Sequence, residues 1–140
     1  MATIKSPGLI LRKTPYSETS LILKVYTRES GLITLMAKGA KRPKSKFAGL
    51  LDFFTLDQFI YPEKSRSEIH TLSDASLIRD FPRIKSDPGV QALGHVFLEL
   101  YLRYMSEPQR SPPHYAWLIE RLESLDEAAE GVRDHALRLC

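Results

Sequence analysis

The hydrophobic pattern of the chain changes its period once, between Leu77 and Val90. Before that point apolar and polar residues alternate, most cleanly over residues 21–27, which is the pattern of a half-buried β-strand. After it, apolar residues return every three or four positions, as they do on one face of an α-helix. A chain with this single change is expected to fold its first part as a sheet and its second part as helices.

Five short strands separated by turn residues are predicted in the first part. This spacing fits a small closed barrel such as the OB-fold. We therefore predict a β-barrel plus α architecture, with a five-stranded OB-fold over residues 1–80 followed by a helical domain over residues 81–140. The predicted strands comprise residues 9–11, 21–27, 32–37, 53–61 and 69–75.

Three helices are predicted in the second part. Asp87 is a suitable N-cap, and Pro88 follows it at the first helical position. Ser111–Pro112 repeats this start signal, and Asp126 is predicted to cap a third helix. That third helix has no stop signal before Cys140, so we expect the helical domain to be truncated and the 140 residues to be cut from a longer protein.

Positive charge is concentrated at the beginning of the chain. The first 50 residues hold ten Lys and Arg against two Asp and Glu, whereas the remaining 90 hold ten against fifteen. The densest basic stretch, residues 38–46, contains no acid, and its glycine and proline predict an exposed loop. Because like charges repel unless counter-charge arrives, we predict that this loop contacts phosphates; the alternative is an ordinary solvated loop. Its cations are Lys38, Lys41, Arg42, Lys44 and Lys46.

A second candidate surface lies on the strand of residues 21–27 and its end. Lys24, Tyr26 and Arg28 share one face, and proteins that bind single-stranded nucleic acid combine cations for phosphates with rings for bases. We predict that Tyr26 stacks on a base. The alternative is that Tyr26 only covers an edge of the barrel and that Lys24 is ordinarily solvated. The predicted surface extends to Arg12, Lys13 and Tyr16.

No catalytic or metal-binding pattern stands out. The four histidines are widely spaced and the single cysteine ends the chain, so neither a histidine metal pair nor an internal disulfide is expected. No apolar run approaches the roughly 18 residues that cross a bilayer. The N-terminus also lacks the apolar segment of a secretory signal. We therefore expect a cytoplasmic protein that is not an enzyme, has no cofactor and does not meet a membrane.

Short motifs stand out at residues 8–11, 15–20, 27–31 and 37–41, with further matches at Leu51, Phe54–Thr55 and Thr71–Leu72. Together these segments resemble the bacterial DNA-repair family RecO. The resemblance implies an OB-fold followed by a helical domain, binding of single- and double-stranded DNA, and annealing of complementary strands. It also implies that, with RecR as a partner, the protein helps RecA replace the single-strand-binding protein SSB on DNA at the nucleoid. Family members run further than this chain, and many carry a cysteine zinc site in that further part. The match continues more loosely through the helices, and Lys38 and Lys41 match the family's basic segment.

The resemblance further implies recognition of the acidic, apolar C-terminal tail of SSB. The last 50 residues hold five Lys and Arg against eight Asp and Glu, so we expect this part to bind the tail rather than DNA. Such a tail needs an apolar groove with one or two cations for its carboxylates, and Arg103 and Arg121 lie beside the apolar stripes. The alternative is that both arginines pair within the chain, with Glu99, Glu107 or Glu123. For the whole chain, the alternative is an OB-fold module that holds protein partners or binds RNA.

Overall fold

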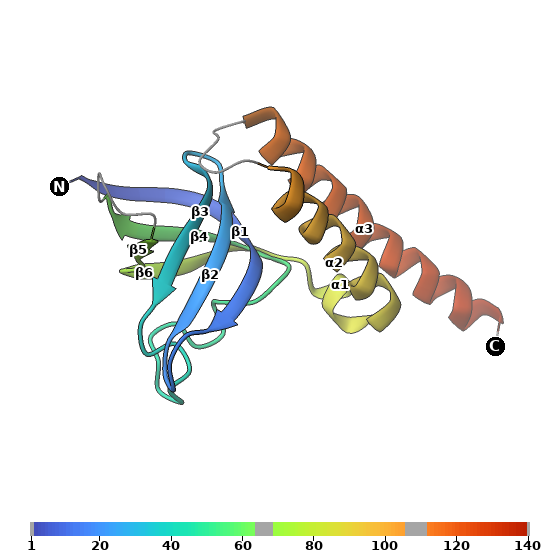
Figure 1. Cartoon of the computed structure of the whole chain (residues 1–140). Helices are drawn as coiled ribbons and strands as arrows, with labels where there is room; N and C mark the ends of the chain where they lie inside the picture. The colour runs from blue at the N-terminus through green and yellow to red at the C-terminus, as the bar shows by residue number, and fades with distance from the viewer. Residues whose placement is uncertain (1, 64–68, 106–111, 140) are drawn as a thin grey trace.

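The computed structural model describes residues 2–63, 69–105 and 112–139. In this part of the chain six strands form one mixed sheet, and three helices gather on one side of it (Figure 1). The strands are β1 (Thr3–Pro15), β2 (Leu21–Thr27), β3 (Gly31–Ala37), β4 (Thr55–Pro62), β5 (Ile69–Thr71) and β6 (Asp74–Asp80). The helices are α1 (Pro82–Ser86), α2 (Pro88–Tyr104) and α3 (Pro112–Leu139).

The sheet is open, so the prediction of five strands closed into a barrel is wrong in both respects. The strand order is β5-β3-β2-β1-β4-β6, with β5 parallel to β3 and β6 antiparallel to β4. The predicted fifth strand is divided because the chain changes its partner. The backbone N–H of Leu72 donates to the Met36 carbonyl beside β3, at 2.9 Å. The next N–H, that of Ser73, donates to the Ile60 carbonyl of β4, at 2.8 Å.

An apolar layer covers each face of the sheet. In β2, Val25 is buried in one layer, and Tyr26, which points to the opposite face, is buried in the other. Phe47, from the loop between β3 and β4, completes the first layer. The second layer lies between sheet and helices and includes Leu98 of α2 and Leu118 of α3. As a result, β2 is buried on both faces where the helices cover it, rather than half-buried as its alternation predicts.

Helix α2 begins as the sequence predicts. The Asp87 side chain accepts hydrogen bonds from the backbone N–H groups of Gly89, at 2.9 Å, and Val90, at 3.2 Å. Helix α3, however, runs without interruption for 28 residues, so the prediction of a separate helix capped by Asp126 is wrong. Neither α3 nor any other helix among the described residues is long and apolar enough to cross a membrane.

Asp126 does cap a helix, but it is α1 rather than its own. Its Oδ1 accepts hydrogen bonds from the backbone N–H groups of Arg83, at 2.9 Å, and Ile84, at 3.1 Å. The residue in the N-cap position of α1, Phe81, makes no side-chain hydrogen bond of this kind. The carboxylate that satisfies the start of α1 therefore arrives from the middle of α3, which joins the two helices.

Candidate nucleic-acid interface and apolar groove

The loop between β3 and β4 carries the predicted cluster of cations and is fastened to the sheet. The backbone N–H of Lys41 donates to the Thr19 carbonyl in the turn between β1 and β2, at 2.8 Å. The Lys13 ammonium of β1 donates to the Leu51 carbonyl at 3.0 Å and lies over the Phe53 ring, 4.7 Å from its centre. Lys13, one of the predicted surface residues, therefore holds the loop in place.

The loop is also folded on itself. Backbone hydrogen bonds from residue i to residue i−3 recur along it, from Arg42 to Gly39, at 3.1 Å, through to Leu50 to Phe47, at 3.0 Å. Gly39 has a φ of 71°, which favours glycine at that turn. The Phe47 side chain is 2% exposed and anchors the loop in the apolar layer of the sheet. The cations are therefore presented by an ordered scaffold.

All five predicted cations of this loop are exposed. The Lys46 ammonium donates a hydrogen bond to the Ser73 carbonyl, and it lies 5.2 Å from the centre of the Phe47 ring. The stretch of residues 30–51 contains no Asp or Glu, so no acidic residue of the loop itself neutralises its positive charge. Such a surface attracts a polyanion. None of the five cations takes part in an ion pair among the described residues; the four besides Lys46 are Lys38, Lys41, Arg42 and Lys44.

Tyr26 does not belong to this surface. Its side chain is only 1% exposed, in edge-to-face contact with Tyr101 of α2, centroids 5.5 Å apart, and stacked on Tyr115 of α3 at 6.4 Å. Burial raises the pKa of its hydroxyl, which has no hydrogen-bond partner among the described residues. The prediction that Tyr26 stacks on a base is therefore wrong, because helices from distant parts of the sequence cover that face of β2.

The remaining strand cations are placed less favourably than the loop. Arg28 is exposed at the end of β2, but its guanidinium lies 3.3 Å from the Glu29 carboxylate. Arg12 of β1 pairs with Glu99 of α2 at 3.4 Å. Lys24 faces Arg12 across the β1–β2 ladder and is half-buried. Acidic neighbours therefore partly neutralise Arg12 and Arg28, and the loop is the stronger candidate for phosphate contact.

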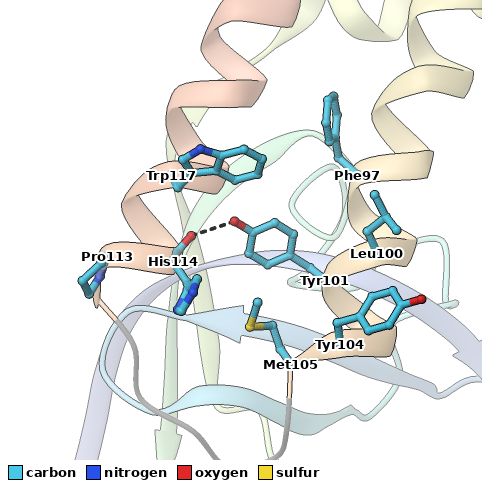
Figure 2. Close-up of a pocket in the computed structure, with 8 residues that line it drawn as sticks. All are labelled: Phe97, Leu100, Tyr101, Tyr104, Met105, Pro113, His114 and Trp117. Atoms are coloured by element: carbon cyan, nitrogen blue, oxygen red, sulfur yellow. Dashed lines mark hydrogen bonds between the residues drawn. The ribbon is translucent and has the colours of Figure 1, made fainter.

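A groove of about 610 Å³ opens between the end of α2 and the beginning of α3 (Figure 2). Tyr101 crosses between the helices, because its hydroxyl donates to the His114 carbonyl at 3.0 Å. Trp117 of α3 stacks on the Tyr101 ring, with centroids 6.0 Å apart and planes 22° apart. Leu100 and Tyr104 of α2 are 46% and 76% exposed, so the wall of the groove is apolar and open to a partner. Figure 2 labels its lining residues, Phe97, Leu100, Tyr101, Tyr104, Met105, Pro113, His114 and Trp117.

The two arginines predicted beside this groove differ in their contacts. Arg103 lies 3.7 Å from Glu99, as the intramolecular alternative predicts, and lines a smaller hollow of about 310 Å³ along α2. The Arg121 guanidinium instead lies over the Trp117 ring, 5.5 Å from its centre. Glu123 is paired with Arg79 of β6. The positive charge of Arg121 therefore lies against Trp117, which lines the groove. Arg103 and Arg12 both pair with the Glu99 carboxylate.

The sequence analysis expected an apolar groove beside the helix stripes, but it did not identify the aromatic residues that line it. Helical periodicity cannot distinguish an aromatic residue that packs inward from one that lies on the rim of a stripe, and Tyr104 and Trp117 are of the second kind. The signal available was the density of aromatic residues near the ends of the two helices.

Asp57, buried in β4, was also not singled out. Burial raises the pKa of the Asp57 carboxyl to about 7, although a hydrogen bond from Thr55 acts to lower it. Asp57 lines neither the groove nor the smaller hollow.

Similarity to known proteins places this architecture in a family. The family model described as "Recombination protein O N terminal" matches residues 1–81, so the chain belongs to that family. Its domain is of the OB type, here with an open mixed sheet and three helices among the described residues.

Curated relatives extend the similarity into the helices. The "DNA repair protein RecO" of Salinibacter ruber is 31% identical over 125 residues, which are 89% of this chain and 48% of that protein. The protein of the same description from Exiguobacterium sibiricum is 32% identical over 126 residues, 90% of this chain and 50% of that protein. The one from Bacillus mycoides is 31% identical over 136 residues, 96% of this chain and 52% of that protein. The chain thus spans about half the length of the curated relatives it matches.

Proposed function

We propose that this chain binds DNA in recombinational repair, through the loop between β3 and β4. The observation that carries the proposal is the ordered loop with five exposed cations, none of them in a described ion pair. The descriptions of the relatives as DNA-repair proteins support it. Because these cations meet phosphates rather than base edges, the binding is independent of sequence and includes single- and double-stranded DNA.

The same chemistry accounts for the further role we propose. A cationic surface that neutralises phosphates on two strands reduces their repulsion and promotes annealing of complementary strands. No covalent step is required, so the protein acts without catalysis and without a cofactor. With RecR, it helps RecA replace SSB on single-stranded DNA, in the cytoplasm at the nucleoid.

For the helical part we propose a second contact, with the C-terminal tail of SSB. The tail is acidic and apolar, and the groove between α2 and α3 offers aromatic walls with Arg121 against Trp117. The cation would pair with a tail carboxylate while the apolar end enters the groove. DNA and the tail would then bind different surfaces of one molecule.

Titration of a fluorescent DNA oligomer at several salt concentrations tests the DNA-binding proposal. Contacts with four phosphates of a single strand predict a log–log slope of about −3. Reversing Lys41, Arg42 and Lys44 to glutamate should weaken all sequences about equally. Lys5→Glu is the control, because Lys5 is exposed on β1 outside the loop. Salt-independent binding, or an equal loss for Lys5→Glu, would contradict the proposal, and tighter binding of RNA would favour the RNA-binding alternative.

A further inference from the structure

We infer that Tyr16 is the base-stacking residue of the basic site, and that it makes the site prefer unpaired single strands. This inference rests on the proposed DNA binding and goes beyond it by naming the form of DNA that fits best. Tyr16 follows β1 directly and its side chain is 65% exposed. No ring contact or cation–π contact engages it among the described residues.

The turn that carries Tyr16 is internally bonded. Its backbone N–H donates to the Ser20 carbonyl at 3.0 Å. The Ser17 hydroxyl accepts hydrogen bonds from the backbone N–H groups of Thr19, at 3.4 Å, and Ser20, at 3.2 Å. The backbone position of Tyr16 is therefore fixed before any ligand arrives, which lowers the entropy lost on binding.

This turn is also part of the basic site. The Thr19 carbonyl accepts the hydrogen bond from the backbone N–H of Lys41, at 2.8 Å, so the turn and the cationic loop are directly connected. Figure 1 shows the turn between β1 and β2 and the loop after β3 at the same end of the sheet. An exposed ring and a group of exposed cations are thus presented side by side, which is the combination that single-strand binding requires.

The charges of the two segments give the strand an orientation. Glu18, exposed in the same turn, repels phosphates, whereas the loop attracts them. A bound strand is therefore expected to lay its backbone along the loop and turn its bases toward Tyr16. Bases in a duplex are already stacked and paired, so only an unpaired base offers its face to the ring.

Fluorescence anisotropy with three ligands tests the inference: a single-stranded oligomer, its duplex, and an abasic oligomer of equal charge. Tyr16→Ala should weaken the single strand about 5- to 150-fold and change the duplex and the abasic oligomer less than about twofold. Tyr16→Phe should retain wild-type affinity. Leu77→Ala is the control, because it removes an exposed apolar side chain from β6, outside the turn, the loop and the groove.

The outcomes separate this inference from the proposal on which it rests. If the wild type binds none of the three ligands, the proposed DNA binding is wrong and the inference falls with it. If the wild type binds and Tyr16→Ala binds the single strand equally well, only the inference is overturned. Equal losses on all three ligands, or a loss for Tyr16→Phe as large as for Tyr16→Ala, would also overturn stacking. Thermal unfolding of each variant confirms that it is folded.

Discussion

Gly94 of α2 lies directly against the ring of Phe54. A Cβ at position 94 would be 2.7 Å from Cε1 and 2.9 Å from Cζ of that ring. Phe54 itself has a φ of 62°, a left-handed conformation that is uncommon outside glycine, and its carbonyl accepts the Phe81 N–H at 3.2 Å. The point where the basic loop passes into β4 is therefore held between α2 and the segment that enters α1, and the absence of a side chain at position 94 permits it.

Substitution of this glycine is expected to destabilise the fold. Gly94→Ala gains about 1 kcal/mol of helix propensity, but the overlap with the Phe54 ring forces a displacement that costs about 1–3 kcal/mol. We expect a net loss of roughly 1 kcal/mol in the free energy of unfolding, measured by urea denaturation. Gly89→Ala is the control, because a Cβ there meets only Asp87 Oδ1, at 3.4 Å. If Gly94→Ala is as stable as Gly89→Ala, the contact does not limit this position.

The buried carboxyl of Asp57 is expected to make stability depend on pH. Burial raises its pKa from 3.8 to about 7, so between these values the folded state binds a proton that the unfolded state releases. Stability from this group is therefore fully present below about pH 4 and is lost as the pH rises to about 7. Because the side chain is fully buried, the loss is on the order of a few kcal/mol.

Asp57→Asn tests this dependence, because the amide has the same shape and does not titrate. The difference in free energy of unfolding between variant and wild type should increase in favour of the variant from about pH 4 to 7 and then level off. Other titrating groups contribute to both proteins and largely cancel. A difference that stays constant over this range would mean that the pKa of Asp57 is the same in the folded and the unfolded protein.

The capping role of Asp126 predicts a loss of stability from a residue outside α1. Asp126→Ala leaves the buried N–H of Ile84 and the N–H of Arg83 without their acceptor, and a loss of about 1–3 kcal/mol is expected. Glu127→Ala, at the adjacent exposed position, should change stability by less than about 0.5 kcal/mol. Equal urea midpoints for the two variants would show that the cross-helix cap contributes nothing.

The sequence predicted the location of single strands and helices better than it predicted which of them lie side by side in the fold. The period of two located β2, the turn at Gly31 located the start of β3, and the Asp87–Pro88 signal located the start of α2, because all three depend on residues close in the chain. The predicted number of strands was wrong because the division of β5 from β6 depends on which distant strand each backbone group pairs with. Asp126 was predicted to cap a helix at its own position, whereas the helix that it caps, α1, begins more than forty positions earlier.

The same distinction holds for the candidate site. Charge density alone identified the loop cations, since a run without acids must be solvated or paired with an anion. Tyr26 was misplaced because alternation assigns a residue to a face of the strand but does not show what covers that face. The apolar groove depends on the packing of α2 against α3, which the sequence pattern of either helix leaves undetermined.

The contacts of the two groove arginines predict unequal effects on binding of the SSB tail. Arg121 lies over Trp117 in no described ion pair, whereas Arg103 already pairs with Glu99. Arg121→Glu should therefore weaken a peptide with the acidic, apolar tail sequence of SSB by about tenfold or more, as expected for loss of a charge-assisted pair, and Arg103→Glu should weaken it less. Peptide titration by calorimetry measures both, with DNA affinity measured in parallel. Affinity for DNA should stay unchanged in each variant. An equal or larger effect of Arg103→Glu would indicate that the tail binds in the smaller hollow along α2 rather than in the groove.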